Sequence, residues 1–275
     1  MSRTPAVTLN NGVSMPQLGF GVFQVPDAEA ETTVATAIEA GYRSIDTATL
    51  YQNEAGTGRG IAASGLPREE LFVTTKLWNT DQGYDSTLRA FDTSLAELGM
   101  DYVDLYLIHW PAPARGSYVD TWRAFERIHS EGRAKAIGVS NFQPAHLQRL
   151  FEASGIVPAV NQIELHPRLQ QAELREFHAA NGIATEAWGP LGRGKGLLDD
   201  PALTRVAGKH GVSPAQVALR WSVQLGTIVI PKSVTPSRIR ENIHVFGFKL
   251  DEEDMAAIAD MHTGVRIGPD PDTLS

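Results

Sequence analysis

The sequence predicts an α/β protein, a (β/α)8 (TIM) barrel preceded by an N-terminal β-hairpin. Short apolar runs alternate with longer helical patterns, which is typical of a parallel sheet with crossover helices. The runs are continuously apolar, as in Ile228–Ile230, and so indicate strands covered on both faces. The length of 275 residues is close to the roughly 250 residues of such a barrel. An open doubly wound sheet is the alternative fold.

The apolar runs predict eight barrel strands. Seven are expected at Tyr42–Asp46, Leu71–Lys76, Val103–His109, Ala134–Val139, Ala159–Gln162, Ile183–Ala187 and Thr227–Ile230, and the first near Gln17–Gly21. Val7–Leu9 and the Asn11-Gly12 turn predict the hairpin. Helices are expected at Glu29–Ala40, Ser86–Leu98, Trp122–Ile128, Ala145–Phe151, Ala172–Ala180, Pro214–Gln224 and Ser237–Val245. We expect one domain over residues 1–275, with a polar loop-like tail at about 264–275.

Composition excludes several classes of protein. The chain has no cysteine, which excludes disulfides, thiolate nucleophiles and cysteine-ligated metals. The net charge of −8 and the absence of basic runs argue against a nucleic-acid partner. No run approaches the roughly 18 apolar residues of a membrane span, and no signal peptide is evident. We therefore expect a cytoplasmic enzyme with a small-molecule substrate and neither a membrane nor a nucleic-acid partner.

Most of the predicted strands end on polar residues. Asp46, Lys76 and His109 end consecutive strands, and Tyr51 follows Asp46 in the next loop. Later strands lead into Ser140-Asn141, Gln162 and Lys232-Ser233. In a barrel the C-terminal ends of all strands meet on one face, where such enzymes have their active sites. These residues are therefore expected to share one site.

The residues at these strand ends suit proton transfer to a carbonyl oxygen. A nearby ammonium lowers the pKa of a tyrosine, so Lys76, kept charged by Asp46, is expected to make Tyr51 a better acid. His109 can orient the same oxygen by a hydrogen bond. Reduction also needs a hydride, which no side chain supplies, and a nicotinamide cofactor is the simplest source.

The segments around these residues resemble the aldo-keto reductase family. The matching segments are Gly41–Ala48 with Tyr51, Asn53 and Glu54, Thr75–Trp78, Asp104–Pro111, Gly138–Phe142, Asn161–Pro167, and Ile230–Ser233 with Arg238, Glu241 and Asn242. The resemblance extends from about Val7 to Met261, and Ala187–Gly192 is most similar to short bacterial members such as 2,5-diketo-D-gluconic acid reductases.

This resemblance implies a role for each matching residue. Tyr51 is the general acid, Lys76 and Asp46 tune it, and His109 orients the carbonyl. The cofactor is NADPH or NADP+. Its nicotinamide carboxamide meets Ser140, Asn141 and Gln162, and Trp188 stacks on the ring where most relatives have tyrosine. The loop Gly189, Pro190, Leu191 and Gly192 covers the pyrophosphate. Lys232, Ser233 and Arg238 bind the 2′-phosphate, and Val234 also belongs to the cofactor-binding set. Glu241 and Asn242 meet the adenine. The family also implies a monomer.

The substrate is expected to be a small aldehyde or ketone, with sugar-derived diketones and α-ketoaldehydes as candidate classes. Phe23, Leu50, Trp78 and Trp110 follow strands on the active face and are expected to contact the substrate. Because little chain follows Met261, we expect a shallow pocket. The role of Arg193, in the same glycine-rich loop, stays open.

Two other functions remain as alternatives. One is an NADPH-binding regulatory protein on the same scaffold. The other is a metal-dependent barrel hydrolase, for which Glu164 and His166 are the only suggestive residues, fewer than such a site usually needs. We therefore predict no metal site. Gly189–Gly196 resembles a phosphate-binding P-loop but has Gly196 where a Mg²⁺-binding serine or threonine is required.

Overall fold

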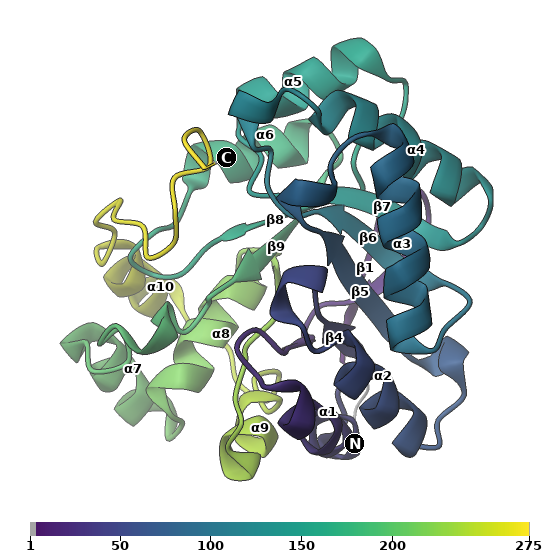
Figure 1. Ribbon diagram of the computed structural model, residues 1–275. Helices are drawn as coiled ribbons and strands as arrows, with labels where there is room; N and C mark the ends of the chain where they lie inside the picture. Colours follow the sequence, from purple (N-terminus) through teal and green to yellow (C-terminus); the bar gives the residue numbers. More distant parts are fainter. Residues whose placement is uncertain (1–3, 275) are drawn as a thin grey trace.

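The computed structural model describes residues 4–274 and shows eight parallel strands surrounded by helices (Figure 1). The barrel strands are β3 (Phe20–Gly21), β4 (Ser44–Asp46), β5 (Phe72–Leu77), β6 (Val103–Ile108), β7 (Ala134–Ser140), β8 (Val160–Glu164), β9 (Ala184–Trp188) and β10 (Ile228–Val229). The helices are α1 (Asp27–Ala40), α2 (Glu54–Ala63), α3 (Tyr84–Leu98), α4 (Tyr118–Ser130), α5 (Pro144–Ala153), α6 (Ala172–Ala180), α7 (Pro201–His210), α8 (Pro214–Gln224), α9 (Pro236–Asn242) and α10 (Glu252–Ala259). The predicted barrel is confirmed.

The sheet closes between its first and last strands. Neighbouring strands pair in sequence order from β3 to β10, and a parallel bridge joins Leu18 to Val229. The amide of Gly19 donates to the carbonyl of Val229 at 2.8 Å, and that of Gly21 to Pro231 at 3.1 Å. A Cβ at Gly19 would lie 2.9 Å from the hydroxyl oxygen of Ser44, so glycine permits this close seam.

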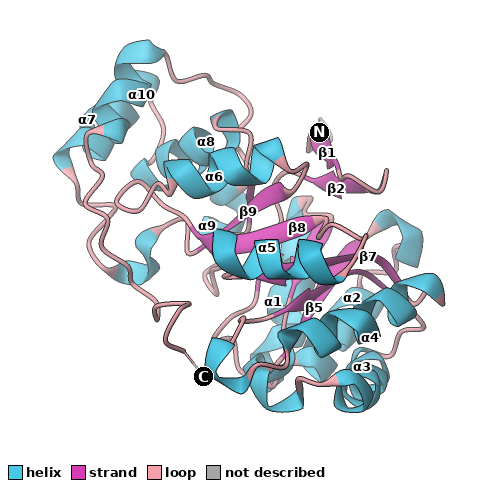
Figure 2. Cartoon of the chain, turned by 90° about the horizontal axis from the view of Figure 1, so that it is seen from above, coloured by secondary structure: helices cyan, strands magenta, loops and turns pink. Residues whose placement is uncertain are grey.

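A small antiparallel hairpin, β1 (Ala6–Thr8) and β2 (Ser14–Pro16), covers the end of the barrel where the strands begin. Buried Leu9 and Met15 join one apolar cluster with barrel residues that include Leu105. The side-chain nitrogen Nδ2 of Asn11 donates to the backbone carbonyl of Lys135 near the start of β7. The hairpin therefore closes the face opposite the strand ends, as Figure 2 also shows.

The seven predicted helices correspond to α1, α3, α4, α5, α6, α8 and α9, although α9 ends at Asn242 rather than at Val245. Three helices, α2, α7 and α10, were not predicted. Two of them carry ordinary start signals, because Asp200 caps α7 and Asp251 forms a capping box at the start of α10.

Helix α2 escaped prediction because glycine, a poor helix former, recurs at Gly56, Gly58 and Gly60. Each glycine lies where a Cβ would collide with a neighbouring helix. An added Cβ would clash with the carbonyl of Leu98 at Gly58 and would lie 2.7 Å from the carbonyl of Glu31 at Gly60. The three glycines therefore let α2 lie directly against α1 and α3.

From Gly264 to Leu274 the tail contains no helix or strand, as expected. It turns back toward the strand ends, and Figure 1 shows it in yellow beside the barrel. Between residues 4 and 274 no helix combines the length and apolar character needed to cross a membrane.

Candidate active site

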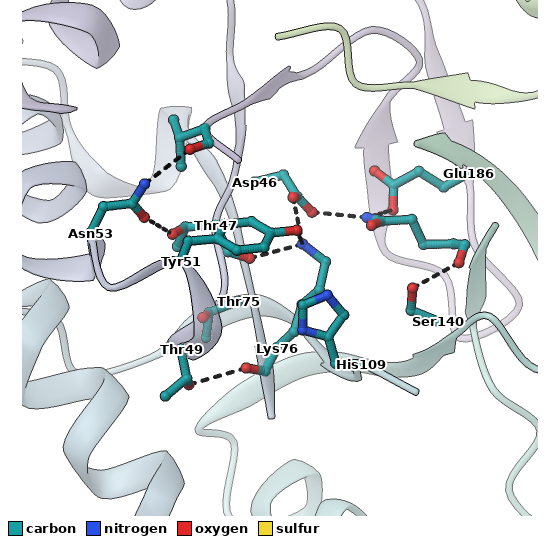
Figure 3. A network of polar contacts seen from close by, with 12 residues as sticks. Asp46, Thr47, Thr49, Tyr51, Asn53, Thr75, Lys76, His109, Ser140 and Glu186 are labelled. Atoms are coloured by element: carbon teal, nitrogen blue, oxygen red, sulfur yellow. Dashed lines mark hydrogen bonds and ion pairs between the residues drawn. The ribbon is translucent and has the colours of Figure 1, made fainter. Parts of the chain in front are cut away.

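A buried ion pair lies at the ends of β4 and β5. The Nζ of Lys76 donates to Oδ1 of Asp46 at 2.5 Å and to the carbonyl of Thr47 at 2.9 Å, and both charged side chains are almost fully buried (Figure 3). Burial alone would lower the pKa of Lys76, but the Asp46 carboxylate, together with Tyr51 and Glu186, outweighs burial and holds that pKa above its usual value. Lys76 is therefore a fixed cation at the floor of the site.

Tyr51 lies beside this pair. A 3-10 turn over Thr49–Tyr51 follows β4 and brings the Tyr51 hydroxyl to 3.4 Å from Nζ of Lys76. Burial raises the pKa of Tyr51, and the ammonium of Lys76 offsets only part of that effect. The sequence predicted a lowered pKa for Tyr51, and this prediction is wrong, because the effect of burial outweighs that of the Lys76 ammonium. The hydroxyl is held protonated, as a proton donor requires.

Asn53 fixes the loop that carries Tyr51. Its side-chain nitrogen donates to the carbonyls of Val22 and Val25, and its oxygen accepts from the hydroxyl of Thr47 at 2.7 Å. These bonds join the loop after β4 to the loop after β3, so the position of the tyrosine is set by the scaffold.

His109 stands beside Tyr51 at the end of β6, with ring centroids 5.6 Å apart. Burial, together with the charge of Lys76, holds the pKa of His109 well below its usual range. The imidazole is therefore neutral near pH 7. Within the described chain its Nδ1 has no hydrogen-bond partner.

Glu186 on β9 is a buried residue that sequence reasoning missed. The Nε2 of Gln162 donates to Oδ2 of Asp46 at 2.9 Å and to Oε2 of Glu186 at 2.8 Å. Burial, reinforced by the charge of Asp46, raises the pKa of Glu186 to about 8. The two carboxyl groups fix the Gln162 amide with its nitrogen toward them. A glutamate inside a buried strand, two residues before Trp188, was the available sequence signal.

Ser140, Asn141 and Trp188 form one hydrogen-bonded group. The indole nitrogen of Trp188 donates to Oδ1 of Asn141 at 2.7 Å. The Asn141 amide nitrogen donates to the hydroxyl of Ser140 and to the carbonyl of His109, both at 3.0 Å. The polar groups expected to meet a nicotinamide are thus brought together, and they are held in place by one another.

These residues line a pocket of about 920 Å³. The predicted residues on its wall are Asp46, Tyr51, His109, Ser140, Asn141, Gln162, Trp188, Gly189, Pro190, Leu191, Lys232, Ser233, Arg238, Glu241 and Asn242, together with Phe23, Leu50, Trp78 and Trp110. Lys76 lies beneath the wall. Neither Lys232 nor Arg238 forms an ion pair within residues 4–274, so both charges remain free for a ligand.

Two residues predicted to bind cofactor do not line the pocket. Gly192 is buried within its own loop, where an added Cβ would lie 2.6 Å from Cβ of Leu197. Val234 is 46% exposed to solvent beyond the pocket.

Aromatic rings form the wall nearest Tyr51. Phe23 meets Tyr51 edge to face at 5.0 Å, and Trp78 meets His109 in the same way at 5.2 Å. The guanidinium of Arg193 lies 4.7 Å from the Phe23 ring centroid, so the glycine-rich loop reaches across the pocket.

The tail adds a wall that sequence did not predict, since Pro269 and Leu274 line the pocket. The short tail therefore forms part of the pocket wall, although it was expected to leave the pocket open. The Glu164–His166 pair, the one suggestion of metal binding, faces this tail. In the described part of the chain no three residues of the types that bind metals cluster together.

Comparisons with known proteins agree with this architecture. A model of the Aldo/keto reductase family matches residues 17–262. An aldo-keto reductase of Mycolicibacterium smegmatis is 59% identical over 272 residues, which cover 99% of this chain and 98% of the relative. Glyoxal reductase of Bacillus subtilis is 53% identical and covers 99% of this chain and 98% of its own. The crystal structure of a Gox0644 mutant in complex with NADPH has a TM-score of 0.95 at 50% identity, covering 100% of both chains. This chain belongs to the aldo/keto reductase family of oxidoreductases.

Proposed function

We propose that the protein uses NADPH to reduce aldehydes or ketones to alcohols, with Tyr51 as the general acid. The observation that carries this proposal is the Tyr51 hydroxyl 3.4 Å from the buried Lys76 ammonium, which is paired with Asp46. A protonated phenol next to a fixed cation, beside a neutral histidine, suits protonation of a carbonyl oxygen as negative charge develops on it.

The residues of the pocket fit a nicotinamide cofactor. Lys232 and Arg238 are unpaired cations on the pocket wall, and a guanidinium grips a phosphate bidentately, which favours NADPH over NADH. Trp188 offers an aromatic face near Asn141 and Gln162, whose amide groups suit a carboxamide. A relative of known structure, the Gox0644 mutant, binds NADPH. When bound, the cofactor supplies the hydride.

The chain's own residues supply the proton and hold the carbonyl. The neutral imidazole of His109 has an N–H with which to orient the carbonyl oxygen, and Tyr51 donates its phenolic proton to that oxygen. The Lys76 ammonium stabilises the phenolate that remains. In the reverse direction the phenolate takes the proton back from the alcohol.

Small reactive dicarbonyl compounds are the substrate class that we propose. The pocket wall around Tyr51 is mostly aromatic, from Phe23, Trp78 and Trp110, and holds no acidic side chain other than the paired Asp46 at this end. A relative with 53% identity is named a glyoxal reductase, which supports α-ketoaldehydes. Sugar-derived diketones are the second class.

A steady-state assay of NADPH oxidation tests the proposal. The panel contains α-ketoaldehydes, sugar-derived diketones and simple aldehydes. Turnover with at least one class is expected. NADPH binding, seen by fluorescence, without turnover on any member would contradict the proposal and favour a regulatory protein on the same scaffold.

A further inference from the structure

Two buried ionisable residues, Glu164 and His166, take no part in the proposed chemistry. Glu164 ends β8, and its carboxylate binds the tail more than 100 residues later in the chain. Oε1 accepts from the backbone amide of Ile267 at 2.6 Å, and Oε2 from that of Gly268 at 2.9 Å. The Nε2 of His166 lies 3.0 Å from Oε1. Glu164 thus acts as a clamp on the C-terminal segment.

The Glu164 carboxylate that forms this clamp is ionised. Burial acts to raise the pKa of Glu164, but the contacts with His166 and the two backbone amides outweigh it and hold that pKa below its usual value. An ionised carboxylate with two amide donors makes charge-assisted hydrogen bonds, about twice as strong as neutral ones. Just before the clamp, the amides of Thr263 and Gly264 donate to the carbonyl of Arg168. The tail is therefore held at two successive points.

The clamped segment lies against the indole of Trp188. A Cβ built on Gly268 would lie 2.5 Å from Cη2 and 3.2 Å from Cζ2 of Trp188, and 3.1 Å from Oε2 of Glu164. Only a residue without a side chain permits this approach. Nε1, which adjoins Cζ2 along the same edge of the indole, donates to Oδ1 of Asn141. The indole is thus held along one edge, at its benzo ring by the tail and at its nitrogen by Asn141.

We propose that Glu164 is a positioning residue for the cofactor: by clamping Ile267 and Gly268 it seats the tail against Trp188 and fixes the indole that faces the nicotinamide. This inference rests on the proposed function, because it requires NADPH to bind beside Trp188. Freeing the indole removes a preorganised stacking surface, and aromatic stacking contributes about 0.5–1.5 kcal/mol. NADPH affinity should therefore fall about threefold to tenfold, with less effect on turnover once the site is saturated.

Gly268→Ala tests the contact between tail and indole. The added methyl displaces either the ring or the tail, so the NADPH Kd is expected to rise threefold or more, with kcat at saturating NADPH within about twofold of the wild type. Gly247→Ala is the matched control, since its Cβ meets no atom within 4 Å and neither glycine has a left-handed φ. Equal Kd values for Gly268→Ala, Gly247→Ala and the wild type would overturn the proposal.

A double-mutant cycle separates positioning from general destabilisation. In a Trp188→Phe background the smaller ring leaves room for the methyl group, so Gly268→Ala should add no further loss of NADPH affinity. A full additional loss there would show that the methyl acts elsewhere and would contradict the proposal.

Hydrogen exchange tests the clamp without the cofactor. The amides of Ile267 and Gly268 should be protected in the wild type and exchange faster in Glu164→Gln, in which one acceptor becomes a donor. Unprotected amides in the wild type would refute the clamp. If the wild type binds NADPH but Gly268→Ala is unaffected, only this inference fails. If the wild type does not bind NADPH, the proposed function fails first.

Discussion

The Nζ of Lys76 lies 3.4 Å from the hydroxyl oxygen of Tyr51, and the same nitrogen is held at 2.5 Å by Asp46. The Asp46 carboxylate keeps the buried Lys76 side chain charged. The Lys76 ammonium lies next to Tyr51, the residue placed to donate a proton. Because burial raises the pKa of Tyr51, the resting site holds a phenol. The cation then stabilises the phenolate formed after the proton has left.

The Glu186 carboxyl predicts a pH-dependent stability. Its pKa in the folded protein is about 8, above the roughly 4.3 of an unfolded glutamate. A raised pKa means that its contribution to stability is complete below about pH 4 and is lost as the pH rises toward 8. Glu186→Gln mimics the neutral acid and still accepts from Gln162. The Tm of Glu186→Gln minus the Tm of the wild type should therefore increase by at least about 2 °C as the pH rises from 5 to 8.

Thermal unfolding at one-unit pH steps measures this difference. Glu152→Gln, which removes an exposed carboxylate from α5, serves as the control and should show a constant difference in Tm. A constant difference for Glu186→Gln as well would mean that Glu186 is ionised across this range.

Cofactor choice is expected to depend on Arg238. Its guanidinium lines the pocket without an ion-pair partner in residues 4–274, and only NADPH has a 2′-phosphate to meet it. Because a charged hydrogen bond contributes about 1.5–3 kcal/mol, Arg238→Ala should weaken NADPH binding about tenfold or more and NADH binding less than about twofold. Fluorescence titration gives both Kd values.

Arg240 provides the comparison on the same helix. It does not line the pocket, and its guanidinium lies 3.8 Å from Glu39. Arg240→Ala should leave both affinities unchanged. Equal losses of NADPH and NADH affinity in Arg238→Ala would place the 2′-phosphate elsewhere.

The packing of α2 predicts opposite outcomes for two Gly→Ala changes. At Gly58 an added methyl group would clash with the carbonyl of Leu98, so the substitution should destabilise the protein by about 1–3 kcal/mol. At Gly208 in α7 a Cβ meets no atom within 4 Å, so alanine should stabilise it by about 0.5–1 kcal/mol. Urea unfolding distinguishes them. A stabilising Gly58→Ala would show that α2 does not lie as closely as described.

Much of the fold and of the site was predictable because consecutive strands of the barrel are also neighbours in space. Asp46, Lys76 and His109 end consecutive strands, and parallel strands bring their ends to one face. Tyr51 joins them through a turn of a few residues. Local sequence therefore determined which residues meet.

Other features depended on contacts between distant segments. Helix α2 contradicts the low helix propensity of its glycines, because its stability comes from close packing on α1 and α3. The tail is polar and lacks periodicity, and its place is set by Glu164. The raised pKa of Tyr51 could not be predicted from residue types, since it depends on how far burial exceeds the effect of Lys76.

Tyr51→Phe tests the central claim most directly, because it removes one oxygen and keeps the ring packed between Phe23 and His109. Turnover should be measured on the best carbonyl substrate at saturating NADPH, with NADPH affinity determined in parallel. We predict a loss of about 10²–10⁴ in kcat with the NADPH Kd within about twofold of the wild type. Wild-type turnover by Tyr51→Phe on every active carbonyl substrate would contradict the assignment of Tyr51 as the general acid.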